Sequence, residues 1–470
     1  MKENKRMRIT FIGAARMVTG SCFYLQTKEI NLLIDCGFFQ GTKENEERNA
    51  DPFPFDPSGI HYLLLTHAHL DHSGLIPKLV RDGFKGKILA TNATVELCRI
   101  MLMDSAYIQE RDAEWDNKKR VRAGKPLLTP LYTADEAAIS LDYFQGIEYG
   151  TIEEIGDGIK VRFQNAGHIL GSAIVELWIN EDASGEKKLV FSGDLGQKNI
   201  PVVSDPTPIE EGDYVFIEST YANRKHKGID ETTEEFRQAV TESLKREGNI
   251  IIPAFAVGRT QNILYLLKKL SLEGRLDHLQ VFVDSPMAIR ATRITLNHPE
   301  CLDDETLELI REGKFSGSNL SLKFTEAVEE SMALNKIKRG AIIISASGMC
   351  NAGRIRHHLK HNLWRPECSV IFVGFQAYGT LGRRIVEGAA RVKLFGEEIA
   401  VKAKIYTIGG LSAHADQAGL MDWLNKFKRK PRRIFVIHGE EETALGFVDA
   451  IKKQLNTDVS APLRREVITI

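Results

Sequence analysis

The sequence has no long hydrophobic run. No stretch of it reaches the roughly 20 apolar residues that a helix needs to cross a bilayer. The first residues, MKENKRMRITFIGAA, are polar and then strand-like, and they lack the continuous apolar core of a signal peptide. We therefore expect no membrane helix, and the cytoplasm is the favoured location.

Paired cysteines and a strong net charge are missing as well. The six cysteines are scattered and form no CxxC motif, which argues against a disulfide framework and against a thiolate zinc site. We expect them to be buried and reduced. The net charge is −1 and the pI is about 6.9. A polyanion would therefore have to bind local positive charge, metal ions or backbone amides rather than an overall cationic field.

The length and the order of the predicted elements indicate several domains. A chain of 470 residues typically forms roughly two to four domains. The first half reads as short β runs joined by turns, with one main helix expected from Ala93 to about Trp115. After Asp213 strands alternate with helices, which is typical of a parallel α/β sheet with ligand loops at the strand carboxyl ends. The polar segment 109–125 is expected to be an exposed loop or helix end with a solvated charge run.

The strongest chemical signal is the motif THAHLDHSG, directly after the apolar strand HYLLL. His67 and His69 are two residues apart, so in an extended segment their side chains point the same way. Asp71 and His72 follow where the strand should give way to a helix. Imidazole and carboxylate ligands without thiolate suit Zn²⁺ in a hydrolytic site, although manganese and iron stay open. We expect His67 and His69 to serve one ion, and Asp71 and His72 a second.

Three further ligand candidates follow other predicted strands beside a glycine. His168 in NAGHILG would complete the ligands of the first ion, and Asp194 in FSGDLG can bridge both ions because a carboxylate has two oxygens. Asp35 in LLIDCG is a candidate for orienting a ligand or the attacking water. Each of these residues, taken alone, is also compatible with an ordinary turn.

In combination and in order, Asp35, the HAHLDH motif, His168 and Asp194 resemble the ligand motifs of the metallo-β-lactamase superfamily. The resemblance implies a four-layer αββα sandwich with two zinc ions at one edge. It fixes the fold better than the substrate, because the superfamily also contains lactamases, thioesterases, glyoxalases and flavo-diiron oxidoreductases.

Three later motifs resemble those of the β-CASP nucleases. Glu218 in FIESTY, His414 in LSAHADQ and His438 in FVIHGEE match motifs A, B and C of that family. The resemblance covers nearly the whole chain and is nearest to bacterial and archaeal ribonucleases similar to the endonuclease subunit of the pre-mRNA 3′-end processing complex. A histidine in motif C is similar to the RNA-cutting branch, whereas the DNA-repair branch typically has an aliphatic residue there.

The resemblance also implies a domain layout and a role for each residue. The central α/β block looks inserted, which predicts a hydrolase domain from 1–210 and 399–470 around a β-CASP domain at 211–398. His438 would join Asp71, His72 and Asp194 on the second ion. His414 is the expected general acid, since imidazole titrates near neutral pH, and Glu218 would orient it. Asp35 and Asp71 complete the expected catalytic set.

Three glycine-containing loops in the central block are candidates for phosphate contacts. Each follows a predicted strand and leads towards a helix, where free amides and the helix dipole favour anions. The glycines of the third loop are not in a GxGxxG register, so a dinucleotide site is not expected. The candidate residues are Gly258, Arg259 and Thr260, then Ser347, Gly348 and Arg354, then Gly379 and Arg383.

The resulting hypothesis is a ribonuclease with two Zn²⁺ ions per chain that acts on single-stranded RNA. The alternatives are a DNA-directed nuclease on the same scaffold, a non-catalytic RNA-binding scaffold and a small-molecule metallohydrolase. A homodimer is a candidate assembly. The sequence leaves open whether cleavage is internal or from the 5′ end, and which RNA is the natural substrate.

Overall fold

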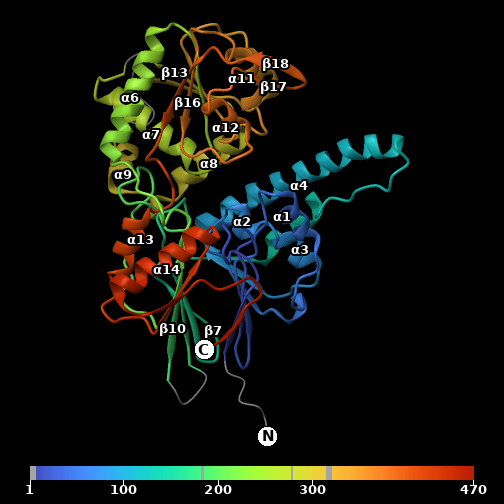
Figure 1. Cartoon of the computed structure of the whole chain (residues 1–470), viewed down its shortest axis with the longest axis vertical. Helices are drawn as coiled ribbons and strands as arrows, with labels where there is room; N and C mark the ends of the chain where they lie inside the picture. Colours follow the sequence, from blue (N-terminus) through green and yellow to red (C-terminus); the bar gives the residue numbers. More distant parts are fainter. Residues whose placement is uncertain (1–6, 181–184, 277–278, 314–319) are drawn as a thin grey trace. The chain divides into compact units, whose positions relative to one another are not determined.

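A computed structural model describes residues 7–180, 185–276, 279–313 and 320–470. The chain forms two compact units (Figure 1). The first unit contains the residues up to Lys198, then Asp205–Lys225 and His414–Ile470. The second contains Asn199–Ser204 and His226–Ala413. The second passage between the units therefore falls later than the boundary expected at residue 398.

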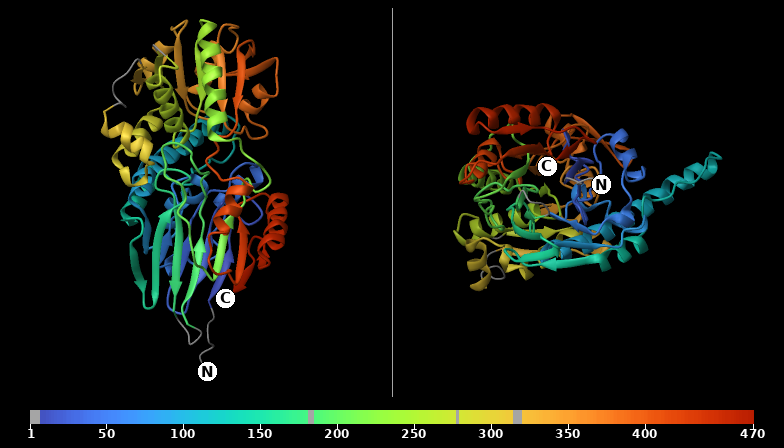
Figure 2. Two further views of the ribbon diagram at one scale, coloured as in Figure 1. Left: turned by 90° about the vertical axis from the view of Figure 1, so that its left-hand side faces the viewer. Right: turned by 90° about the horizontal axis from the view of Figure 1, so that it is seen from below.

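The first unit is built on two seven-stranded sheets (Figure 2). In spatial order, the first sheet consists of β22 (Val467–Thr469), β1 (Arg8–Phe11), β2 (Phe23–Gln26), β3 (Asn31–Ile34), β4 (Tyr62–Leu64), β5 (Lys87–Thr91) and β6 (Phe144–Ile147). The second consists of β21 (Asp458–Ser460), β20 (Arg433–Ile437), β11 (Tyr214–Glu218), β10 (Lys187–Phe191), β9 (Ala173–Ile179), β8 (Ile159–Asn165) and β7 (Ile152–Gly156).

Each of these sheets has an antiparallel half and a parallel half. Strands β3, β4, β5 and β6 run parallel to one another, and so do β10, β11, β20 and β21. Strand β8 runs the same way as β10, because each pairs antiparallel with β9. Within each sheet the carboxyl ends of these strands therefore lie at one edge, where the loops that follow them gather.

The two sheets pack face to face, and alternate residues of the central strands enter different cores. Phe216 of β11 lies in the core between the sheets, stacked on Phe191 at 4.1 Å and on Phe435 at 4.8 Å between ring centroids. Its neighbours Val215 and Ile217 point the other way, into the core under the outer helices. This alternation follows from the two-residue period of a strand.

Helices cover the outer faces and complete the αββα sandwich that was expected. Residues of α13 and α14 fill the outer core of the second sheet, and α4 packs on β5 and β6 of the first sheet. The helices of the first unit are α1 (Lys43–Glu47), α2 (Leu70–Ser73), α3 (Ile76–Arg81), α4 (Asn92–Arg122), α5 (Ala134–Ser140), α13 (Gln417–Leu424) and α14 (Glu441–Leu455). Helix α4 extends beyond the expected end near Trp115, so most of the polar segment 109–125 is helical.

The second unit has a six-stranded, fully parallel sheet, as the alternation of strands and helices predicted. Its spatial order is β14 (Leu320–Phe324), β13 (Leu279–Val283), β15 (Ala341–Ser345), β12 (Ile250–Pro253), β16 (Ser369–Val373) and β19 (Lys404–Ile408). A hairpin is formed by β17 (Arg391–Leu394) and β18 (Glu397–Ala400). The helices are α6 (Ile229–Lys245), α7 (Arg259–Leu272), α8 (Pro286–Asn297), α9 (Asp304–Arg311), α10 (Val328–Leu334), α11 (Ile355–Asn362) and α12 (Leu381–Val386).

In the described part of the chain, no helix combines the length and the apolarity that a bilayer span requires. All six cysteines are buried and free of disulfides, as expected.

Candidate metal centre

The predicted metal ligands lie at the carboxyl ends of strands in the first unit. Asp35 directly follows β3, and His67 comes three residues after the end of β4. In the second sheet, His168 follows β8, Asp194 follows β10 and His438 follows β20. The sandwich therefore brings loops from distant parts of the sequence to one place.

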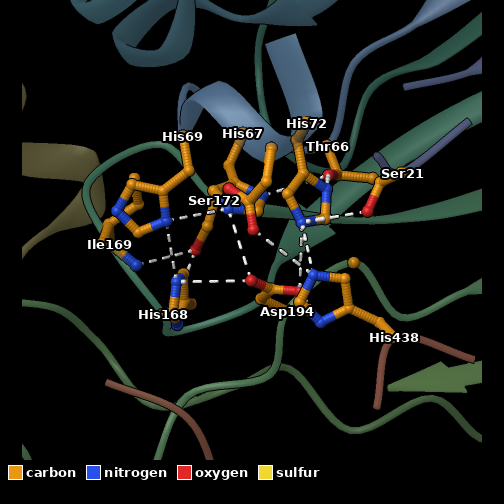
Figure 3. A network of polar contacts seen from close by, with 12 residues as sticks. Ser21, Thr66, His67, His69, His72, His168, Ile169, Ser172, Asp194 and His438 are labelled. Atoms are coloured by element: carbon orange, nitrogen blue, oxygen red, sulfur yellow. Dashed lines mark hydrogen bonds and ion pairs between the residues drawn. The ribbon is translucent and has the colours of Figure 1, made fainter. Parts of the chain in front are cut away.

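A first group of ligand atoms converges around Asp194 Oδ2 (Figure 3). His69 Nδ1 lies 3.1 Å from His67 Nε2 and 3.2 Å from His168 Nε2. Asp194 Oδ2 lies 3.5 Å from His67 Nε2 and 3.6 Å from His168 Nε2. Three imidazole nitrogens and one carboxylate oxygen thus face a common point, and they come from the residues that the sequence assigned to the first ion.

A second group lies on the other side of the same carboxylate. His72 Nε2 is 3.2 Å from His438 Nε2 and 3.4 Å from Asp194 Oδ1. Asp71 Oδ2 is 3.5 Å from His438 Nε2. Asp194 therefore presents one oxygen to each group, and Figure 3 shows its side chain between the rings of His168 and His438. This is the arrangement that a bridging carboxylate requires.

The local backbone holds these loops in unusual conformations. Asp35 and His438 have positive φ angles of 61° and 47°, which non-glycine residues adopt rarely and which occur mostly where function demands them. The peptide nitrogen of Cys36 donates to the carbonyl of His72 at 2.7 Å, and Gly37 passes so close to Asp71 that an added Cβ would lie 1.7 Å from its carbonyl oxygen. The segment after β3 is thereby locked to the HAHLDH turn.

The charge states of the ligands suit a cation. Burial lowers the pKa of His67 well below its usual value and also lowers the pKa of His69, so both rings are neutral donors. Burial would raise the pKa of Asp194, but the surrounding histidines, His438 and His72 above all, hold it well below its usual range. For Asp71 the hydrogen bond with His438 outweighs burial and lowers the pKa to about 2.

The buried carboxylate of Asp194 also tests whether these residues fit metal ions. Among the described residues, its Oδ1 is buried and accepts no hydrogen bond. Burial would lower the pKa of His72, but Asp194 and Asp35 raise it well above the usual value. The carboxylates thus draw positive charge into a buried site, and a metal ion would supply that charge without the proton. Imidazole and carboxylate donors without thiolate fit Zn²⁺ in a hydrolytic site.

Asp35 contacts a ligand histidine rather than the convergence point. Its Oδ2 lies 2.7 Å from His72 Nδ1, and its Oδ1 accepts a hydrogen bond from the Thr66 peptide nitrogen at 2.7 Å. A carboxylate on the far nitrogen of a metal ligand fixes the ring orientation and increases its basicity. Of the two roles expected for Asp35, this geometry favours the orientation of a ligand.

His414 and Glu218 form a pair beside the first group. His414 Nδ1 lies 3.1 Å from Glu218 Oε1 and 3.9 Å from Asp194 Oδ2. Glu218 is fully buried and accepts hydrogen bonds from the peptide nitrogens of Leu195 at 2.7 Å and Thr220 at 3.1 Å. Burial lowers the pKa of His414, but the charges of Glu218 and Asp194 outweigh it and raise the pKa to about 9. The imidazole is therefore held as a proton donor.

Three hydroxyl residues hold ligand loops, although sequence reasoning gave them no role. Thr66 Oγ1 donates to Asp35 Oδ2 at 2.9 Å, Thr220 Oγ1 lies 3.0 Å from His438 Nδ1, and Ser172 Oγ accepts from the His168 peptide nitrogen at 3.0 Å. Thr66 and Thr220 stand inside the quoted motifs, so their position was a usable signal. Ser172 lies beyond its motif and gave none.

The expected phosphate residues of the second unit gather on neighbouring strand ends. Strands β15, β12 and β16 are adjacent, so the loops with Gly258, Gly348 and Gly379 share one edge of the sheet. Within this group, Gln376 Nε2 donates to the carbonyl of Gly348 at 3.1 Å, and Thr260 Oγ1 donates to the carbonyl of Phe255 at 2.8 Å.

The arginines in these loops have protein partners, and so does Ser347. The guanidinium of Arg354 donates to the buried Asp284 at 2.8 Å and to the carbonyl of Glu326 at 2.8 Å. Arg383 donates to Glu387 at 2.6 Å, Ser347 Oγ donates to the carbonyl of Ala352 at 3.3 Å, and Arg259 is buried. Arg354 thus has a structural role in the second unit, and the phosphate contacts stay a prediction.

The αββα sandwich with its histidine and aspartate cluster defines a metal-dependent hydrolase of the metallo-β-lactamase type. Family sequence models match in three segments: the metallo-β-lactamase superfamily at residues 16–253, the Beta-Casp domain at 260–385 and the Zn-dependent metallo-hydrolase RNA specificity domain at 398–462. The chain therefore belongs to the metallo-β-lactamase superfamily, in the family whose members carry an inserted Beta-Casp domain.

Individual relatives agree with this assignment. The chain is 38% identical over 451 residues to a ribonuclease of Thermus thermophilus, covering 95% of this chain and 97% of the relative. It is 30% identical over 485 residues to the transcription termination factor FttA of Methanosarcina mazei, covering 100% of this chain and 72% of the factor. A crystal structure of a protein of unknown function from Enterococcus faecalis V583 has the same fold, with a TM-score of 0.60 at 11% identity over 99% of this chain and 100% of that one.

Proposed function

We propose that this protein is a zinc-dependent ribonuclease that hydrolyses RNA phosphodiester bonds with two metal ions. The observation that carries the proposal is the pair of ligand groups that share Asp194. His67, His69 and His168 would hold one ion, and Asp71, His72 and His438 the other. Two cations in such a site supply Lewis-acid activation of water and neutralise the charge that develops on a phosphate.

The residues of the chain itself supply the proton for the leaving oxygen. His414 lies beside the first group and is kept protonated by Glu218, so it is placed to donate to the departing ribose oxygen. The two peptide nitrogens that bind Glu218 keep this carboxylate ionised and fixed. Asp35 orients His72 from behind and does not itself contact the reacting atoms.

RNA is favoured over DNA by the comparisons. The segment that matches the RNA specificity model includes both His414 and His438, and the relative from Thermus thermophilus is named as a ribonuclease over nearly the whole length of this chain. The glycine loops of the second unit would contact the backbone of a single strand through their peptide amides.

The test is digestion of an end-labelled, single-stranded RNA next to a DNA of the same sequence, with and without a chelator. We expect cleavage of the RNA only, loss of cleavage with the chelator and recovery on addition of Zn²⁺. The product lengths separate internal cleavage from digestion from the 5′ end. Cleavage that persists after complete removal of metal, or equal cleavage of the DNA, contradicts the proposal.

A further inference from the structure

The outer half of α4 has no part in the core of the first unit. The last buried residue of the helix is Ala106, and from Tyr107 to Leu131 no residue is buried. With a rise of 1.5 Å per residue, the segment 107–122 is an arm of roughly 24 Å. Figures 1 and 2 both show this end of α4 projecting away from the two sheets.

The chain that returns from the tip covers one side of the arm. Asn117 Nδ2 donates to the carbonyl of Leu128 at 2.9 Å, and the peptide nitrogen of Leu128 donates to Asn117 Oδ1 at 2.8 Å. Arg120 Nε donates to the carbonyl of Pro126 at 2.5 Å. These bonds fix the rotation of the arm, so its opposite side is the open one.

The open side carries a stripe of cations around one tryptophan. Residues at spacings of three and four share a side of a helix. The exposed residues that follow this spacing, here called the arm stripe, are Ile108, Arg111, Trp115, Lys118, Lys119 and Arg122. At 100° per residue the four cations lie within roughly 60° of Trp115, whereas Glu110, Glu114 and Asp116 lie about 100° or more away and Asp112 lies at the edge.

Trp115 is available as a stacking surface. Its side chain is 64% exposed, and Lys119 Nζ lies 5.5 Å from its ring centroid. Cations that follow a backbone, together with an exposed aromatic ring, are the features with which proteins bind single-stranded nucleic acid. Basic residues in a last turn also favour the helix dipole, but this explains neither Arg111 nor Trp115. Pairing with a second copy through the same face would set cations against cations.

We propose that the arm stripe is a second RNA-binding site, which holds the strand at a distance from the metal centre. The proposal rests on the proposed function for the identity of the ligand. Arg111, Lys118, Lys119 and Arg122 would bind phosphates, and Trp115 would stack on a base.

The position of the arm sets a minimum length for RNA that can use both sites. The base of α4 lies beside a ligand loop, because Thr94 Oγ1 donates to the carbonyl of Gly171 at 2.8 Å, three residues after His168. From Thr94 to Lys118 the helix rises roughly 36 Å. A stacked strand at about 3.4 Å per nucleotide needs roughly ten nucleotides to cover that distance. Shorter RNA can reach the metal centre or the arm, but not both.

The experiment compares a short single-stranded RNA of about 6 nucleotides with one of about 30. The variant R111Q/K118Q/K119Q/R122Q is set against K43Q/K87Q/K452Q/K453Q, which removes four exposed cations from other surfaces of the same unit. We expect the arm variant to raise KM for the long RNA about 10-fold at unchanged kcat, to leave the short RNA unchanged, and to reduce the salt dependence of log binding by about 3, at 0.7 per phosphate contact. The control variant should match the wild type.

Trp115 gives an independent test. Trp115→Ala should weaken binding of the long RNA about 5-fold or more, and Trp115→Phe should restore most of it, because stacking needs a ring. Fluorescence anisotropy measures this binding without cleavage, so a failure of the proposed ribonuclease function is seen separately as lack of cleavage by the wild type. Equal binding of long RNA by the wild type and the arm variant overturns the proposal. An equal loss with short and long RNA, or arm-dependent self-association without any effect on RNA, does so as well.

Discussion

At the scale of single residues, the candidate centre depends on hydrogen bonds between residues that are far apart in sequence. The HAHLDH motif identified four ligands because they lie within six residues. The role of Thr66 depends instead on Asp35, which lies 31 positions earlier. Spacing along one segment carries no information about such a bond, so the ligands could be predicted and most of the residues that hold them could not.

The first residue-scale prediction separates proton donation from metal binding. His414→Ala should lower kcat at least about 100-fold, because a general acid contributes roughly 100- to 10,000-fold, while the zinc content stays that of the wild type. His69→Ala should lower both. Zinc per chain by atomic absorption and kcat on a single-stranded RNA are the two measurements.

The exposed His61 offers a control for this pair. His61→Ala should change neither kcat nor zinc content. Complete loss of zinc in the His414 variant would contradict the role given to His414, since it would make that histidine a ligand.

At the scale of secondary structure, strands and buried helices were predictable and the arm was not. The periodicity of apolar residues indicates a helix only where one side is buried. Beyond Ala106 the helix α4 has no buried side, so the pattern vanished near Trp115 although the helix continues to Arg122. Its residues there are mostly good helix formers such as Glu, Arg, Lys and Ala, and their intrinsic preference extends it.

The contact of the β3 loop with the HAHLDH turn leads to a stability prediction. Gly37→Ala places a Cβ 1.7 Å from the Asp71 carbonyl oxygen, so the two backbones must separate. We expect a loss of about 2 kcal/mol or more in the free energy of unfolding, as for other overpacked sites, together with weaker zinc binding. Thermal unfolding and zinc titration measure the two effects.

Gly446 in α14 is the matched control, because an added Cβ there meets nothing within 4 Å. Gly446→Ala should raise stability by up to about 1 kcal/mol, since alanine is the better helix former. An unchanged melting temperature for Gly37→Ala would show that the loop and the turn are free to move apart.

A second element-scale prediction concerns acid sensitivity in the second unit. Burial would raise the pKa of Asp284, but hydrogen bonds from His358, Ser331 and Arg354 outweigh it, so the pKa is lowered. A lowered folded-state pKa contributes stability that is present above the unfolded value of about 4 and is lost as the pH falls through the folded value. The contribution of Asp284 is therefore full at neutral pH.

Asp284→Asn should consequently lower the melting temperature at pH 7, by the equivalent of about 3 kcal/mol for a broken buried ion pair. Below about pH 4 the difference from the wild type should shrink. Melting curves across this pH range test the sign. A difference that grows as the pH falls would contradict it.

At the scale of the whole molecule, the metal centre is assembled from three separate segments of chain. His72 and His438 are 366 positions apart and yet their Nε2 atoms are 3.2 Å apart. Strand β22 near the end of the chain pairs with β1 near its start, so the first unit closes only after the second has been inserted. The resemblance of the motifs predicted this insertion. A homodimer and a cytoplasmic location stay predictions.

Removal of metal should therefore destabilise the first unit as well as abolish activity. A ligand that binds only the folded state stabilises it by about 4 kcal/mol at a free concentration of 1,000 times Kd. We expect chelation to lower the melting temperature by several degrees and Zn²⁺ to restore it. The Asp194→Ala variant, which loses the shared carboxylate, should not respond to either. An equal shift in that variant would place the stabilising ion elsewhere.

The sequence by itself determined the chemistry of the ligands and the order in which they occur, because each ligand stands beside a strand end that local pattern reveals. Only the tertiary structure decided which strand ends share an edge, which oxygen of Asp194 faces which group, that Asp284 holds Arg354, and that α4 extends into solvent. These properties depend on packing between residues hundreds of positions apart, and no local pattern encodes such distances.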